Sequence, residues 1–194
     1  MNIPKPFEVE IAKEKYYVLV TGIEFTKPKS LENLINRINS IKREYDVSIT
    51  LVNPKILATK IHGILAAKYA IKSFKYKLNV SRRLDLEILV YIAANRQIKE
   101  AIRLAGPEDR FSFTVFIAVS KDTKSLNKVL EIFLKEERGT LNDSILRITK
   151  EKFHYIRNVF SIRDEELRVT LAKDEEEALT KCVLTRLTIF HIKK

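Results

Sequence analysis

Apolar positions follow two different periods along the chain, and three short segments have the composition of strands. Residues 16–25 (YYVLVTGIEF) and residues 47–52 (VSITLV) are rich in β-branched and aromatic residues, which predicts a strand in each. Residues 111–119 (FSFTVFIAV) are apolar at almost every position, a pattern typical of a strand covered on both faces. We therefore expect residues 111–119 to lie in the centre of a sheet.

Other segments repeat their apolar residues at helical spacing. A helix that starts at Ser30 is followed by a long helix over residues 55–75, with Pro54 in its first turn. The buried side of this long helix is assigned to Leu57, Ile61, Ile64, Leu65, Ile71 and Phe74. Further helices are predicted over residues 84–94, 96–105, 125–139, 149–160 and 174–191, with a helical turn at residues 164–167.

This order of elements predicts a mixed α/β (α+β) fold, with a small mixed sheet of about four strands and helices packed on both sides. No internal repeat or low-complexity segment divides the sequence, so we expect a single domain over residues 1–194. The bend at residues 139–142 is the best candidate for a subdivision.

The charge balance favours an anionic partner. Lys and Arg number 36 against 25 Asp and Glu, a formal net charge of +11. An excess of this size is typical of proteins that bind nucleic acid or anionic membranes. No apolar run approaches the roughly 20 residues of a membrane helix, so we expect no membrane partner. The alternative is a surface charge that serves only solubility.

The cysteine count and the N-terminal residues predict a cytoplasmic protein. Cys182 is the only cysteine, which excludes an intrachain disulfide and is typical of a reducing compartment. The first residues, MNIPKPFEVEIAKEK, lack the apolar core of a secretion signal.

The familiar catalytic and metal-binding motifs do not occur. The histidines His62, His154 and His191 are far apart, and neither HExxH nor CxxC is present. All four glycines are isolated, which excludes the glycine-rich loops that cradle phosphates. We therefore expect a protein that is not an enzyme and that needs no metal or other cofactor.

Basic residues gather around the predicted helix over residues 96–105, for which Asn95 is the expected cap and Gly106-Pro107 the stop. Arg96, Lys99 and Arg103 are spaced so that they project from one face of this helix. The cations before it are Lys68, Lys72, Lys75, Lys77, Arg82 and Arg83. Cations on rigid elements joined by short turns can follow a phosphate backbone.

Polar and aromatic residues accompany these cations. Asn95 and Gln97 can read base edges, and the rings of Tyr69, Phe74 and Tyr76 can stack on unpaired bases. The alternative is a solvated helix face beside aromatic residues of the core. The spacing of the residues does not exclude it.

A family resemblance favours the first interpretation. Residues 53–119 contain a signature made of Glu87-Ile88-Leu89, Tyr91-Ile92, Arg96-Gln97-Ile98, Ala101-Ile102 and Gly106. In this signature the segment resembles the tRNA-binding accessory subunit of the KEOPS complex, a family that includes the PRPK-binding protein. Many members carry a Gly before the Arg-Gln-Ile run, where this chain has Ala93-Ala94-Asn95. We expect Asn95 to form the turn instead and to adopt the unusual backbone angle.

The resemblance implies a non-catalytic subunit that binds the single-stranded 3′ CCA tail of tRNA. It also implies binding to the complex's atypical kinase/ATPase subunit and, through it, to the catalytic threonylcarbamoyl-transferase subunit. Arg96, Gln97 and Ile98 would contact the tail, with Asn95 beside them. The residues expected to guide phosphates are Lys99, Arg103, Lys72, Lys75, Arg82 and Arg83. The alternative is a structural adaptor that binds an acidic protein and has no RNA affinity of its own.

Overall fold

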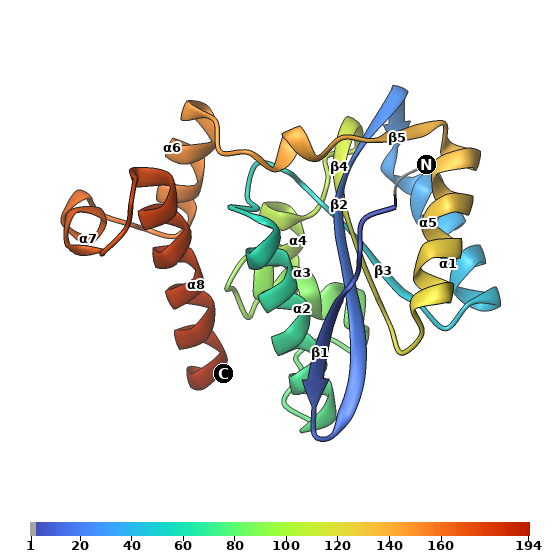
Figure 1. Cartoon of the computed structure of the whole chain (residues 1–194), viewed down its shortest axis with the longest axis horizontal. Helices are drawn as coiled ribbons and strands as arrows, with labels where there is room; N and C mark the ends of the chain where they lie inside the picture. The colour runs from blue at the N-terminus through green and yellow to red at the C-terminus, as the bar shows by residue number, and fades with distance from the viewer. Residues whose placement is uncertain (1–2) are drawn as a thin grey trace.

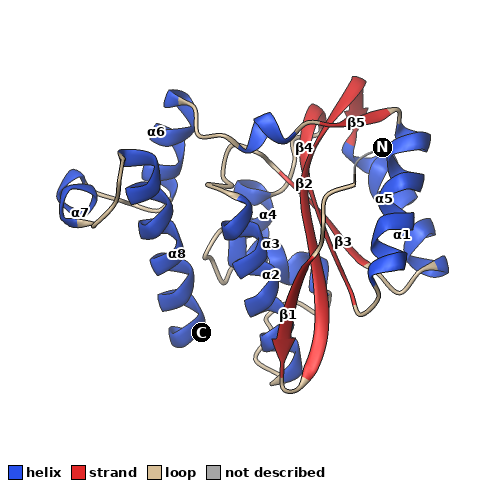
Figure 2. Cartoon of the chain, in the orientation of Figure 1, coloured by secondary structure: helices blue, strands red, loops and turns tan. Residues whose placement is uncertain are grey.

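The computed structural model of the chain describes residues 3–194 and places an antiparallel sheet between layers of helices (Figures 1 and 2). The strands β1 (Phe7–Ile11), β2 (Glu14–Ser30), β4 (Arg110–Ser120) and β3 (Ser48–Val52) lie side by side in that order, and β5 (Gly139–Leu141) also pairs with β2. The predicted α/β class is confirmed. In the described part of the chain the sheet has five strands, all paired antiparallel, rather than the expected mixed sheet of about four.

β4 is the central strand, as its apolar sequence predicted. It pairs with β2 on one side and with β3 on the other, and its residues from Thr114 to Ser120 are buried. Because helices cover both faces of the sheet, every position of this part of β4 meets apolar neighbours. The predicted central position is confirmed.

β1 forms a hairpin with β2 that the sequence analysis did not predict. Ala12 and Lys13 have positive φ values of 51° and 64°, the backbone conformation of a two-residue hairpin turn. Val9 and Ile11 are buried while the residues between and before them are exposed. The strand is short and its turn has no Gly or Asn, so the usual hairpin signal is missing.

Helices cover both faces of the sheet, as predicted. α1 (Leu31–Glu44) and α5 (Thr123–Glu137) lie on one face, and α2 (Lys60–Lys75), α3 (Leu84–Ile92) and α4 (Ile98–Ala105) lie on the other (Figure 1). α6 (Lys150–Val159), α7 (Asp164–Val169) and α8 (Glu175–Lys193) form an outer layer, in which α8 packs against α2 and α3. None of the helices within residues 3–194 is both long enough and apolar enough to span a bilayer.

The bend at residues 139–142 is held against β2 by strand pairing and hydrogen bonds. Asp143 begins the 3-10 helix η1 (Asp143–Leu146), and its Oδ1 accepts hydrogen bonds from the Gly22 amide (2.9 Å) and the Thr21 hydroxyl (3.0 Å). The chain then crosses from the α5 side of the sheet to the outer layer (Figure 1). The single domain stays a prediction, and so does a subdivision at this bend.

α2 begins at Lys60, so the prediction that Pro54 lies in its first turn is wrong. The Thr59 side chain caps α2 by accepting a hydrogen bond from the His62 amide. Residues 56–58 are fully buried in a non-helical segment that crosses the core before the helix starts. Burial of this segment outweighs the preference of Pro54 for a helical first turn.

The buried side of α2 also differs from the prediction. Ile61 is 57% exposed, and Ile64, Leu65 and Phe74 are only half-buried, while Leu57 and Ile71 are buried as expected. Small residues line the inner face instead: Gly63, Ala66, Ala67, Ala70 and Ser73. A Cβ at Gly63 would lie 3.2 Å from the Ile117 side chain. The close approach of α2 to the sheet therefore selects small residues over large apolar ones.

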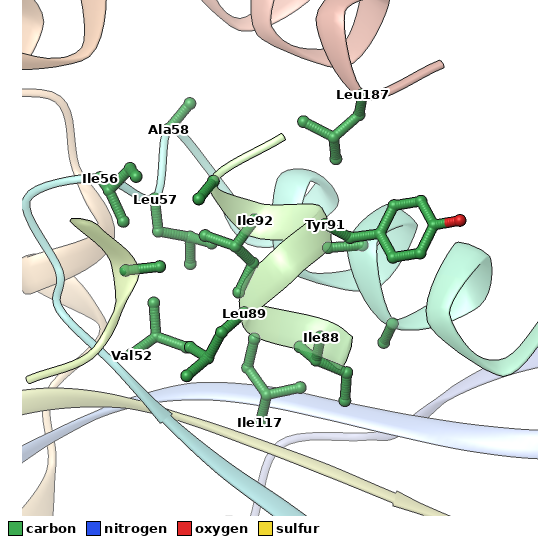
Figure 3. Packing of buried hydrophobic residues seen from close by; sticks show 14 of the residues in the cluster. Val52, Ile56, Leu57, Ala58, Ile88, Leu89, Tyr91, Ile92, Ile117 and Leu187 are labelled. Atoms are coloured by element: carbon green, nitrogen blue, oxygen red, sulfur yellow. The ribbon is translucent and has the colours of Figure 1, made fainter. Parts of the chain in front are cut away.

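α3 is buried on nearly all sides. Residues from Glu87 to Ile92 are all buried, and Figure 3 shows α3 between Val52 and Ile117 of the sheet and Leu187 of α8. A helix enclosed in this way is held by packing at both ends. Its position fixes the two loops that precede and follow it.

His62 of α2 is a fully buried histidine that holds two segments together. Its Nδ1 accepts a hydrogen bond from the Ala58 amide (3.2 Å), so the proton lies on Nε2, which donates to the Ile92 carbonyl (3.2 Å). Burial lowers the pKa of His62 from 6.5 to about 3. The imidazole is therefore neutral in the folded protein, and its role in this position is structural.

We predict that His62 makes the fold sensitive to acid. Below pH 6.5 the unfolded chain binds a proton at His62 that the folded protein does not bind until about pH 3. The free energy of unfolding should therefore fall with decreasing pH across this window, at up to about 1.4 kcal/mol per pH unit. Urea unfolding from pH 7 to pH 4 measures the slope, which His62→Gln should flatten. His154→Gln is the control, because His154 is exposed. If His62→Gln showed the same slope as the wild type, the prediction would be contradicted.

Candidate nucleic-acid interface

The predicted binding residues lie on the loops at the two ends of α3 and on the helices next to them. The loop over residues 76–83 precedes α3 and carries Arg82 and Arg83, while the turn over residues 93–97 follows it and carries Arg96 and Gln97. α2 contributes Lys72 and the C-terminal part of α8 packs beside it. Because α3 is enclosed by the core, the loops keep a fixed separation.

The turn after α3 depends on Ala94 rather than on Asn95. Ala94 has a positive φ of 46°, so it takes the left-handed conformation that was expected at Asn95. The Asn95 side chain instead accepts a hydrogen bond from the Gln97 amide at 2.9 Å. Gln97, not Asn95, is the N-cap residue of α4, which begins at Ile98. The predicted cap at Asn95 is therefore wrong, although its side chain does shape the turn.

Arg96 lies in this turn, before the first residue of α4. It is exposed, and its guanidinium donates a hydrogen bond to the backbone carbonyl of Lys193 at the end of α8. Lys99 and Arg103 remain on α4, so the prediction that all three share one helical face is wrong for Arg96. The turn directs Arg96 toward α8 because the left-handed residue reverses the chain two positions earlier.

The predicted cations fall into two groups according to their ion pairs. Lys75 pairs with Glu14, whose pKa Lys121 and Lys75 lower to about 2. Arg83 pairs with Asp85 at 2.6 Å and Arg103 with Glu100 at 2.8 Å. The second group forms no ion pair with a carboxylate of residues 3–194: Lys72, Arg82, Arg96 and Lys99. A phosphate would meet this second group without displacing a carboxylate.

The neutral residues predicted to contact bases differ in accessibility. Gln97 is exposed, whereas Ile98 is half-buried against the core around α3. Of the aromatic residues, Tyr76 is 53% exposed and Phe74 is half-buried. Tyr69 is half-buried and its ring stacks on His191, with centroids 4.3 Å apart. Gln97 and Tyr76 are thus the residues of this set with the freest side chains.

The structure adds the end of α8, which the sequence analysis did not include in the site. His191 and Lys193 lie there, and burial together with Lys72 and Lys194 lowers the pKa of His191. The pair Lys193-Lys194 was assigned only to the helix dipole, since its distance of about 100 residues from Arg96 gave no signal of contact. The Arg96 hydrogen bond to the Lys193 carbonyl brings this basic end into the site.

Among the described residues, no group of three or more His, Cys, Asp or Glu side chains is arranged to hold a metal ion. The site consists of cations, an exposed amide and aromatic rings on rigid elements. Such an arrangement is chemically suited to an anion that carries flat, unpaired rings.

Comparison with known proteins gives the family. A family model described as "Kinase binding protein CGI-121" matches residues 25–190, which include every element from the end of β2 to most of α8. The chain belongs to this family. The resemblance to the KEOPS accessory subunit, first based on the residues around Arg96-Gln97-Ile98, is confirmed.

The chain is similar in sequence to two archaeal proteins. The chain is 30% identical over 127 residues to "Regulatory protein Cgi121" of Methanocaldococcus jannaschii, an alignment that covers 66% of this chain and 79% of the relative. It is 32% identical over 88 residues to "KEOPS complex subunit Cgi121" of Pyrococcus abyssi, which covers 44% of this chain and 52% of the relative. These names support a regulatory or accessory subunit that binds a kinase.

We predict that glycine at position 94 stabilises the turn. Ala94→Gly removes the steric cost of a Cβ at positive φ, which is about 1–2 kcal/mol, and loses part of this gain to chain entropy. Ala93→Gly is the matched control, because Ala93 is buried with φ −81° and ψ −9° and gains nothing from glycine. Ala94→Gly should therefore unfold at a higher urea concentration than Ala93→Gly. Its free energy of unfolding should exceed that of Ala93→Gly by about 1–2 kcal/mol. Equal destabilisation by both substitutions would contradict this account of the turn.

Proposed function

We propose that this protein is a non-catalytic subunit of a KEOPS complex that binds the single-stranded 3′ CCA tail of tRNA. In this role it also binds the complex's atypical kinase/ATPase subunit, and through it the catalytic subunit that makes threonylcarbamoyl-adenosine in tRNA. The family description and the names of the relatives support the complex and the kinase partner. The tRNA-binding role rests on the residues at the ends of α3.

One observation carries this part of the proposal: exposed cations without a carboxylate partner lie on the loops at both ends of α3 and on the helices α2 and α8 that pack against it. Lys72 belongs to α2, Arg82 to the loop before α3, Arg96 to the turn after it and Lys193 to α8. A cation without a carboxylate partner can meet a phosphate without first breaking an ion pair. Part of the net charge of +11 is therefore available to an anion around α3.

A single strand suits this surface better than a duplex. The cations lie on short loops and helix ends rather than along one long helix, so they fit no groove of a regular duplex. An unpaired strand offers phosphates, base edges and ring faces within a few ångströms of each other. Gln97 supplies an exposed amide for base edges, and Tyr76 supplies an exposed ring for stacking.

The remaining cations contribute less in this proposal. Lys75, Arg83 and Arg103 each have a carboxylate partner, so a phosphate must compete for them. The pairs of Lys75 with Glu14 and of Arg103 with Glu100 are at the surface and worth only about 0–1 kcal/mol, so the strand can exchange them. Asp85, the partner of Arg83, is buried. Ile98 and Asn95 act mainly on the shape of the turn, because the first is half-buried and the second bonds the Gln97 amide.

The test is a gel shift that compares intact tRNA with tRNA lacking its CCA end, using the whole protein. We expect binding that depends on the CCA end and that weakens steeply with salt. Arg96→Glu should lower the affinity roughly ten- to hundredfold. It should reduce the slope of log affinity against log salt by about 0.7 for a single strand.

The control for this variant is Arg43→Glu, which reverses the charge of an exposed arginine on α1, across the sheet from the site. Arg43→Glu should retain nearly the affinity of the wild type. Thermal unfolding shows whether both variants keep the fold. Undiminished CCA-dependent binding by Arg96→Glu would refute the site, and absence of tRNA binding by the wild type would leave the adaptor of an acidic protein as the function.

A further inference from the structure

Glu87 is a charged residue in the core that the proposed function does not use. It lies on α3 with no exposed surface, so no ligand can touch it. Its Oε2 accepts hydrogen bonds from the backbone amides of Val80 (3.1 Å) and Ser81 (2.8 Å), and its Oε1 pairs with the Lys194 ammonium. One buried carboxylate therefore holds the loop before α3 and the residue after α8 at the same time.

Lys194 is the other half of this arrangement. Its side chain is only 4% exposed and its Nζ lies over the Tyr91 ring, 4.3 Å from the centroid. Burial lowers the pKa of Lys194, while the Glu87 carboxylate acts in the opposite direction. An ammonium taken out of water needs such a partner. The position of the end of α8 consequently depends on Glu87.

These contacts join the two loops that carry the free cations. Ser81, held by Glu87, precedes Arg82, and Lys193, beside Lys194, accepts the hydrogen bond from Arg96. The connection runs from Arg82 through Glu87 and Lys194 to Arg96, so it spans both ends of α3. The end of α8 acts as a bridge between the loops.

We propose that Glu87 and Lys194 are positioning residues that hold Arg82 and Arg96 in the arrangement required by the RNA end. The proposal rests on the proposed function. A short single strand has few contacts, so its affinity depends on cations that are already in place before binding. Glu87 acts through the loop amides and Lys194, and Lys194 acts through the end of α8.

The sign of the effect separates this role from plain electrostatics. Glu87→Gln removes a negative charge from a protein that binds a polyanion, and charge alone would strengthen RNA binding. If Glu87 positions the cations, the same substitution weakens binding, by roughly three- to tenfold. Glu137→Gln is the control, because Glu137 on α5 also pairs with a lysine, Lys29, but on the other side of the sheet. Its tRNA affinity should be equal to that of the wild type or slightly higher.

Lys194 gives a second test that does not require the Glu87 variant to fold. Lys194→Met removes the ammonium but keeps most of the side-chain volume. Lys193→Met removes the same charge from the neighbouring exposed residue. Lys194→Met should lose more affinity for tRNA than Lys193→Met. Because Glu87 and Lys194 act through the same contact, the double variant Glu87→Gln/Lys194→Met should bind tRNA as well as whichever of its two single variants binds more weakly.

Amide hydrogen exchange measures the same contacts without RNA. Glu87→Gln and Lys194→Met should speed exchange at Val80 and Ser81, whose amides the carboxylate holds. Lys193→Met should leave the exchange rates of the Val80 and Ser81 amides unchanged.

The outcomes distinguish the two proposals. If the wild type binds tRNA through its CCA end but Glu87→Gln and Lys194→Met bind as tightly, the positioning role is overturned and the proposed function stands. Unchanged exchange at Val80 and Ser81 in Lys194→Met overturns it as well. If the wild type does not bind tRNA, the proposed function and the inference fall together. The positioning role is supported if Glu87→Gln weakens binding and Lys194→Met weakens it more than Lys193→Met does.

Discussion

The enclosure of α3 is the constraint on which the candidate site depends. Its residues from Glu87 to Ile92 are buried by the sheet on one side and by α2 and α8 on the other (Figure 3). A helix that packs on all sides cannot shift without opening a cavity, which costs several kcal/mol in a close-packed core. The helix itself therefore fixes the distance between the loops at its two ends. It thereby also fixes the distance between the backbone positions of the cations on these loops.

The distribution of charge follows from the same packing. Near the sheet and on the outer layer, cations such as Lys29, Lys60 and Arg186 find carboxylates within 3 Å. Among the described residues, the two buried acids are Asp85 and Glu87 in the first turn of α3, and both are already engaged. Arg82 and Lys72 are left to solvent and counterions. Free cations on elements held at a fixed spacing can attract a polyanion without first losing a carboxylate partner.

The sequence predicted the elements whose signal is local. The apolar run at residues 111–119 correctly indicated the central strand, and the helical spacing after Ser30 correctly indicated α1. The inner face of α2 was predicted wrongly because large apolar residues were assumed to point inward, whereas the approach of the helix to the sheet leaves room only for residues such as Ala66 and Ala67. The left-handed residue was predicted at Asn95 but lies at Ala94. Asn tolerates that conformation better than Ala, but the tertiary contacts of the turn outweigh this preference.

The site itself could be predicted only in part, for a different reason. Arg82, Arg96 and Lys72 could be chosen from charge and from the family resemblance, because each lies within one stretch of the sequence. The contacts from Arg96 to Lys193 and from Glu87 to Lys194 join residues 97 and 107 positions apart. No spacing rule relates residues at such distances, so the part played by the end of α8 becomes visible only once the chain is folded.

A buried ion pair explains little of the stability of this fold. Taking the charges of Glu87 and Lys194 out of water costs about as much as their attraction returns, and an apolar pair of the same volume is often as stable or more so. The pair differs from an apolar contact in being directional: the carboxylate accepts two loop amides on one oxygen and the ammonium on the other. Apolar packing would leave the loop free to slide over α3. The charges specify one arrangement of the loop and of α8. In the proposed role of Arg82 and Arg96 in RNA binding, that specification matters more than additional stability.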